Sequence, residues 1–147
     1  MALPSDRWLA GLIGANLDSL ADNMAAHAKE RTPAHRALDP AAVHSGFVAF
    51  YRALAAEVAT GDPEHMRAHL ARVIPVRLQA GAHVDELVGL VDRLEGEVVD
   101  LLQRTDATDH AHVAAARPHL ERIHKNVRGL VREVARQTGG SGGHAAR

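Results

Sequence analysis

Apolar residues recur along this chain at intervals of three and four, the spacing that places side chains on one face of an α-helix. The pattern is clearest within residues 62–102, where two such stripes flank Ala80-Gly81-Ala82. The stripes comprise Met66, Leu70, Val73, Ile74 and Leu78, and then Val84, Leu87, Val88, Val91, Leu94, Val98, Leu101 and Leu102. Because a one-sided stripe must pack against another element, this segment predicts two packed helices that meet at Gly81, a natural left-handed helix end.

An earlier helix is expected to begin just after Pro4, with Ser5 or Asp6 capping its first turn. The apolar pattern of this helix ends in the polar segment 27–35. Its stripe comprises Leu9, Ile13, Leu17, Leu20 and Met24. One continuous helix is therefore predicted over this part of the chain.

A further helix is predicted to begin at Asp39-Pro40, because an acceptor at the N-cap precedes the residue type favoured at the first helical position. Gly61 ends it. Its face comprises Val43, Phe47, Phe50, Tyr51, Leu54 and Val58. Asp62-Pro63 then repeats the start signal for the next helix, in which Pro75 predicts a kink about one turn earlier.

The last helix is predicted over about 109–137, with Pro118 either kinking it or separating a short preceding turn. Its stripe alternates strictly between four and three and comprises Ala116, Leu120, Ile123, Val127, Leu130 and Val134. A sustained seven-residue repeat predicts coiled-coil-like packing, with a second copy of the chain as the candidate partner. Residues 138–147 are rich in glycine and are expected to form a flexible tail.

The fold class follows from these helices and from the lack of any strand pattern or hairpin-turn signal. Five helices with short connections predict an all-α, globin-like five-helix bundle, with residues 1–137 as a single domain. At 147 residues the chain is long enough to bury a core of its own.

Composition excludes several classes of function. The chain has no cysteine, so disulfides, thiolate metal sites and cysteine nucleophiles are ruled out, and a cytoplasmic location is expected. It carries 17 basic and 18 acidic residues, a balance that argues against nucleic-acid binding. No segment is apolar for long enough to suggest a membrane span. The basic residues do concentrate within 117–136, which is either a solvated helix face or a docking face for an acidic partner.

The helices also resemble a known family. Trp8 stands in the first helix, the Asp39-Pro40 helix carries an aromatic cluster, and the Asp62-Pro63 helix ends in Arg-Leu-Gln-Ala-Gly before a long Val/Leu helix. Together these features resemble the N-terminal domain of the RsbR-type co-antagonists of the bacterial stressosome, a globin-like domain without haem. The resemblance spans about residues 6–136 and is best within 41–102.

That resemblance implies a non-enzymatic, homodimeric sensory or scaffold module in stress signalling, normally placed before a STAS signalling domain. The sequence departs from the pattern because only the glycine-rich segment follows Gln137. Either the chain is an excised or stand-alone sensor domain, or its output partner, a STAS-domain or other signalling protein, is a separate polypeptide. In such proteins the first and last helices build the dimer. The corresponding interface residues here are Ile13, Leu17, Leu20, Leu120, Ile123, Val127, Leu130 and Val134.

A haem- or metal-binding gas or redox sensor is the alternative, since the chain contains 11 histidines. The candidate haem ligands are His44, His69 and His83, although few aromatic residues are available to wall a haem pocket. His65 and His69 have a spacing that can hold a metal on one helix face, but no third ligand is evident. No resident cofactor or metal is therefore expected. The remaining histidines of the last helix, His110, His112, His119 and His124, are expected to face solvent.

Arg77 lies within one turn of two apolar residues, so its stem is expected to be buried. Either its head reaches water, or it forms an ion pair with Glu95 or Asp92 of the next helix. No serine stands in a nucleophile motif, so an enzyme is not expected.

Overall fold

The computed structural model describes residues 4–31 and 39–146, with the side chains of residues 6–26, 39–106 and 108–138. Helices account for almost all of this part of the chain, and the described ranges contain no strand, which confirms the all-α prediction. The helices are α1 (Pro4–Ala15), α2 (Leu17–Arg31), α4 (Pro40–Thr60), α5 (Glu64–Gln79) and α6 (Val84–Ala146). Among the described helices, none combines the length and apolar character that a membrane crossing requires.

The predicted first helix is divided at Asn16, so the expectation of one continuous helix was wrong. The backbone N–H of Asn16 donates to the Ile13 carbonyl at 3.0 Å, and its side-chain amide donates to the Leu12 carbonyl at 2.8 Å. An asparagine side chain that bonds to nearby backbone offers the chain an alternative to the helical ladder. The chain therefore turns between α1 and α2.

Helix α4 begins and ends where the sequence predicts. Pro40 occupies its first position, and Gly61 closes it in the left-handed conformation with φ of 75°. The Gly61 N–H donates to the Glu57 carbonyl at 2.7 Å. Asp39 makes no side-chain capping hydrogen bond, so proline at the first position is the start signal that operates here.

Helix α5 starts after Asp62, whose Oδ1 accepts a hydrogen bond from the Glu64 N–H at 3.0 Å. It continues through Pro75 to Gln79. Gly81 then adopts φ of 102°, as expected for a left-handed helix end. The Ala82 N–H donates to the Arg77 carbonyl and the Gly81 N–H to the Leu78 carbonyl, so the end of α5 is a Schellman motif.

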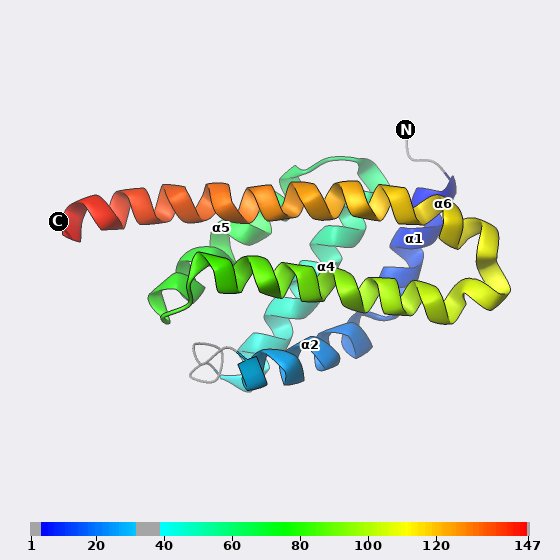
Figure 1. Ribbon diagram of the computed structural model, residues 1–147, viewed down its shortest axis with the longest axis horizontal. Coiled ribbons are helices and arrows are strands. Elements are labelled where there is room, and N and C mark those ends of the chain that lie inside the picture. The colour runs from blue at the N-terminus through cyan, green and yellow to red at the C-terminus, as the bar shows by residue number, and fades with distance from the viewer. Residues whose placement is uncertain (1–3, 32–38, 147) are drawn as a thin grey trace.

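Helix α6 consists of two arms that meet at a sharp backbone break at Asp109, where φ is −131° and ψ is 40°. Residues 84–108 form the first arm and residues 110–146 the second, and the second runs back beside the first (Figure 1). Pro118 lies within the second arm. The backbone stays helical to Ala146, beyond the predicted end at Gln137, while the flexibility of the glycine-rich segment stays a prediction.

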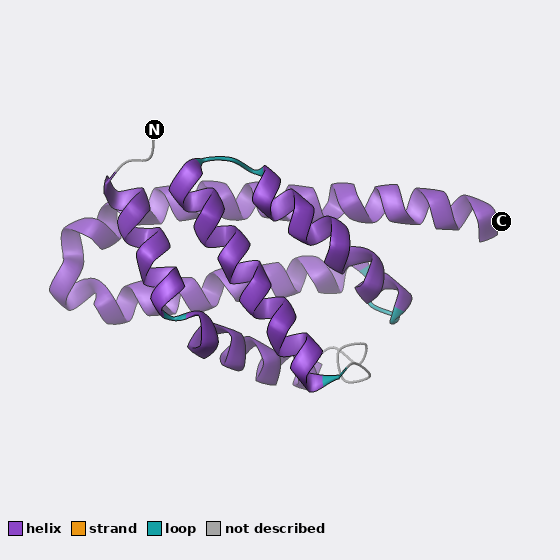
Figure 2. Ribbon diagram, turned by 180° about the vertical axis from the view of Figure 1, so that it is seen from behind, coloured by secondary structure: helices purple, strands orange, loops and turns teal. Residues whose placement is uncertain are grey.

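The molecule has two layers, which Figures 1 and 2 show from opposite sides. The arms of α6 form one layer, and α1, α4 and α5 cross over it. Tyr51 of α4 connects the two layers by a hydrogen bond, because its fully buried hydroxyl donates to the Leu94 carbonyl of the first arm at 3.0 Å. Burial raises the pKa of Tyr51, so the hydroxyl keeps its proton.

The stripe assigned to a dimer interface lies inside this single chain. Seven of its eight residues are buried in the core, and Leu17 is partly buried against it. The seven are Ile13, Leu20, Leu120, Ile123, Val127, Leu130 and Val134. Intramolecular packing of the second arm therefore accounts for the seven-residue repeat. A homodimer stays a prediction, and it requires a surface other than these side chains.

Candidate functional site

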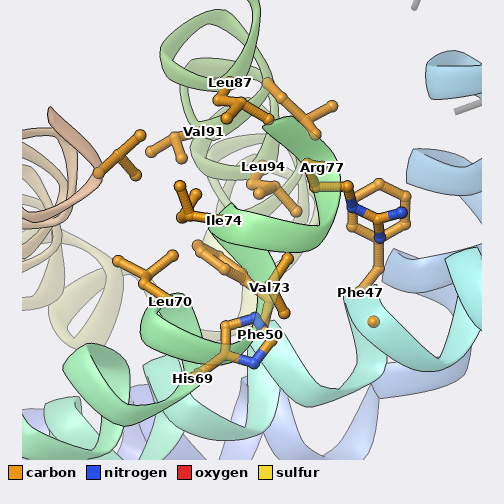
Figure 3. Close-up of a pocket in the computed structure, with 13 residues that line it drawn as sticks. Phe47, Phe50, His69, Leu70, Val73, Ile74, Arg77, Leu87, Val91 and Leu94 are labelled. Atoms are coloured by element: carbon orange, nitrogen blue, oxygen red, sulfur yellow. The ribbon is translucent and has the colours of Figure 1, made fainter. Parts of the chain in front are cut away.

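A small cavity of about 40 Å³ lies where α4, α5 and both arms of α6 meet (Figure 3). Val91 and Leu94 contribute from the first arm and Val131 from the second. Apart from Gly46, its walls are apolar side chains and two polar ones, His69 and Arg77. A cavity of this size has room for about three water-sized groups. The cavity and its two polar residues form the candidate site.

Arg77 comes from the last turn of α5 and is only 7 % exposed. Its guanidinium points from α5 towards α4 (Figure 3). Gly46 makes room for it there, because a Cβ built on Gly46 would stand 3.0 Å from Nη2 of Arg77. Burial lowers the pKa of Arg77, but an arginine keeps its charge in a protein. The site therefore holds a buried cation.

The predicted ion pair of Arg77 with Glu95 or Asp92 is wrong. Both carboxylates turn instead to the second arm, where His124 approaches Asp92 at 2.9 Å and Glu95 at 3.4 Å. Arg128 also pairs with Asp92, at 3.3 Å. The Arg77 side chain is largely buried, as expected for its stem, and its guanidinium keeps a slight contact with solvent. No carboxylate within the described ranges forms an ion pair with Arg77.

His69 lies two turns before Arg77 on the same face of α5 and is 4 % exposed. Its ring meets Phe50 edge to face, with centroids 5.9 Å apart. Its Nδ1 is buried and has no hydrogen-bond partner. Burial, followed by the charges of Arg72 and Arg77, lowers the pKa of His69 to about 4. At neutral pH the ring is therefore uncharged, with one nitrogen as a donor and one as an acceptor.

His69 also lines an open groove of about 350 Å³ between α4 and α5. Three alanines form the α4 side of this groove, and Arg52, His65 and Arg72 stand around it. No acidic side chain lines it. His69 thus separates a basic, open surface from the apolar cavity behind it.

The predicted haem ligands are not brought together. His44 pairs with Asp22 of α2 at 2.9 Å, and His83 is exposed before α6, where its backbone N–H donates to Oε1 of Glu86 at 2.9 Å. Only His69 reaches the cavity. Ligand pockets of drug size occupy roughly 300–1,000 Å³, so the cavity as it stands is too small for haem. Within the described residues, no group of three possible metal ligands occurs.

Two histidines of the second arm depart from the expectation that they face solvent. The His119 side chain is 18 % exposed and stands 3.4 Å from Asp6 of α1, while His124 is 14 % exposed and joins the two arms as described above. His110 and His112 are exposed, as expected. The sequence pattern missed these pairs because their acidic partners lie on other segments.

Sequence reasoning also missed Gly46 and Glu57. Gly46 stands between apolar positions of α4 and gives no turn signal. Glu57 is buried, and one of its carboxylate oxygens, Oε1, has no hydrogen-bond partner. Burial and, to a lesser degree, Asp62 raise the pKa of Glu57, whereas His65 lowers it. Its place directly before Val58 on the apolar face was the one available signal.

Comparison with known proteins does not identify the chain: no family model, no curated protein and no solved structure matches it. Its function must therefore be inferred from its own geometry. That geometry is a small apolar cavity, a buried cation and an uncharged histidine at the junction of three helices.

Proposed function

We propose that this chain is a non-enzymatic sensory or regulatory domain of the RsbR N-terminal type, with a globin-like arrangement of its helices. Occupation of the cavity changes the packing of α5 against α6, and the second arm carries that change to a partner. The observation that carries the proposal is the position of the cavity, because its walls come from α4, α5 and both arms of α6. Packed interfaces respond to such a change by shifting as units.

The proposal includes a homodimer and a STAS-domain or other signalling protein as the partner. The second arm supports this choice of surface, since Arg122, Lys125, Arg132 and Arg136 are exposed along it. They form a face that suits an acidic partner. Val76, which is 52 % exposed, is the one large apolar side chain left open within the described ranges, so a large apolar dimer seam receives no support from this surface.

A haem- or metal-based sensor is the weaker candidate. It would require the cavity to expand greatly and His69 to bind iron while its partner ligand comes from elsewhere. The ring of His44 pairs with Asp22, and neither His44 nor His83 lines the cavity. We therefore do not adopt it.

The packing mechanism can be tested by measuring the distance between the two arms. The chain has no cysteine, so spin labels can be attached solely at Asp85→Cys and Arg132→Cys, both exposed positions on opposite arms. In this background Val73→Phe places a larger side chain in the cavity from the α5 side. We expect the distribution of distances between the labels to shift.

Val76→Phe is the matched control, because it makes the same change on the same helix at an exposed position. It should leave the label distances unchanged. If the Val73→Phe protein is folded and its distance distribution matches that of the parent, the proposed relay through α6 is wrong.

A further inference from the structure

Arg77 presents a charge that the fold does not neutralise. Two other buried charged groups have partners of opposite charge: Glu97 pairs with Arg93 at 3.1 Å, and Asp6 stands beside His119. Glu57, which is buried and forms no ion pair among the described residues, has a raised pKa that favours its neutral form. Arg77, by contrast, is 7 % exposed and forms no ion pair within the described ranges. Taking a cation out of water without an anion costs several kcal/mol. A bound anion would remove that cost.

The rest of the cavity defines the kind of anion. Beyond the guanidinium, the walls are aliphatic or aromatic, and the second polar residue, His69, is uncharged at neutral pH. One fixed positive charge matches one negative charge, and apolar walls match a hydrocarbon chain. A phosphate dianion would leave a charge uncompensated among apolar side chains.

The geometry points to a short aliphatic monocarboxylate as the ligand of this cavity. Its carboxylate pairs with the planar guanidinium of Arg77, which suits carboxylates geometrically. Its hydrocarbon chain packs against the apolar lining residues, which include Val73 of α5 and Leu94 of the first arm, both labelled in Figure 3. This inference rests on the proposed sensory function and names the chemical class that the site recognises.

The size of the cavity limits the chain length. About 40 Å³ holds only a few heavy atoms, so acetate fits, propionate fits if the walls give way by about one methylene group, and octanoate does not fit. His69, the other polar residue of the lining, lies about two helical turns before Arg77 on α5. Arg77 keeps a slight contact with solvent, so its charge is accessible to a small anion.

Titration of the full chain with sodium propionate at constant ionic strength, followed by NMR, tests this inference. We expect shifts centred on Val73, Ile74 and Leu94. Propionamide, which has nearly the same shape but no charge, should bind at least about tenfold more weakly, since it lacks the charge-assisted pair with Arg77. Octanoate should not bind in the cavity.

Arg77→Met keeps much of the side-chain volume and removes the charge, so it should weaken propionate binding by at least about tenfold. Arg72→Met is the matched control, because it removes an exposed charge from the same helix and should change the affinity less than about twofold. Gly46→Ala offers a second variant that retains Arg77. Its added methyl group displaces the guanidinium and should also weaken binding.

Three outcomes would overturn the inference: no binding at tens of millimolar propionate, equal binding of propionate and propionamide, or an equal loss in the Arg72 and Arg77 variants. The last would place the anion in the open groove. None of these results affects the arm-distance measurement with Val73→Phe, which uses no ligand. The proposed relay and the proposed ligand can therefore fail separately.

Discussion

At the scale of single residues, Arg77 and His69 stand out because they are the two polar residues that line the cavity, and neither has an ion pair among the described residues. A buried polar group normally has its hydrogen bond, since leaving it without one costs about 1–3 kcal/mol. The Nδ1 of His69 lacks such a partner, and Arg77 lacks a carboxylate. Residues that reduce the stability of the unliganded fold in this way are typical of binding sites.

This view predicts that Arg77→Met stabilises the protein without ligand. Removing a buried charge that has no ion-pair partner also removes the cost of taking that charge out of water, which reaches several kcal/mol for a fully buried ion. We expect the free energy of unfolding in urea to rise by about 1 kcal/mol or more. Arg72→Met should change it by less than about 0.5 kcal/mol, as is usual at the surface. A marked loss of stability in Arg77→Met would mean that Arg77 serves the fold itself.

His69 predicts a dependence of stability on pH. Its pKa is 6.5 in its ordinary state and about 4 in the fold, so between these values the unfolded chain binds the extra proton. The contribution of the uncharged ring to the free energy of unfolding is therefore fully present above pH 6.5. As the pH falls from 6.5 towards 4, the free energy of unfolding decreases by up to about 3 kcal/mol. Glu57 acts in the opposite direction, because its raised pKa makes the fold hold a proton as the pH increases above 4.5.

Urea denaturation of His69→Gln across pH 4 to 6.5 isolates the contribution of His69. The variant should lose less stability on acidification than the parent chain, while Glu57 contributes equally to both. The exposed His83, replaced by glutamine, provides the control and should leave the pH dependence as it is. Parallel curves for His69→Gln and the parent would contradict the lowered pKa.

At the scale of elements, two exposed glycines should respond in opposite ways to alanine. Gly81 holds φ of 102° at the end of α5, where a Cβ is strained, so Gly81→Ala should destabilise the fold by about 1 kcal/mol. Gly89 lies inside the first arm with open space where a Cβ would point. Gly89→Ala should stabilise the fold by about 0.5–1 kcal/mol. Thermal unfolding of both variants checks the signs.

The element boundaries show what a sequence can predict. Pro40, Gly61 and Gly81 act through their own backbone chemistry, so the start of α4 and the ends of α4 and α5 were predictable. The turn at Asn16 was not, because the apolar stripe continues in phase from α1 into α2 and hides it. Periodicity shows that a face is buried but not what buries it.

The candidate site was predictable only in part. Arg77 and His69 both attracted notice, one for its apolar neighbours and the other for its imidazole. Their shared cavity could not be foreseen, because its walls come from segments up to 85 positions apart, from Gly46 to Val131. Gly46 illustrates the same limit, since its importance lies in the space it leaves for a side chain of another helix.

At the scale of the whole molecule, a substitution in the second arm tests whether its apolar stripe packs within one chain or forms a dimer interface. Ile123 is 5 % exposed within one chain, so Ile123→Asp should unfold the protein, at a cost of several kcal/mol. An interface residue would instead yield a folded monomer. Circular dichroism and light scattering on the same sample separate the two results, with Lys125→Asp, at an exposed position two residues away, as the control.

The break at Asp109 also marks a point where the chain can be cut into two fragments. In the sequence, all the other helical segments come before this point and the second arm comes after it, and Thr108 and His110 on either side are exposed. Because the contacts across the break are made by side chains rather than by the connection itself, a chain cut between positions 108 and 109 should reassemble from its two fragments. The second fragment alone, deprived of the surface that buries its stripe, should be largely unfolded. A reporter domain inserted at this point should therefore be tolerated, and its signal would depend on whether the two arms are packed together.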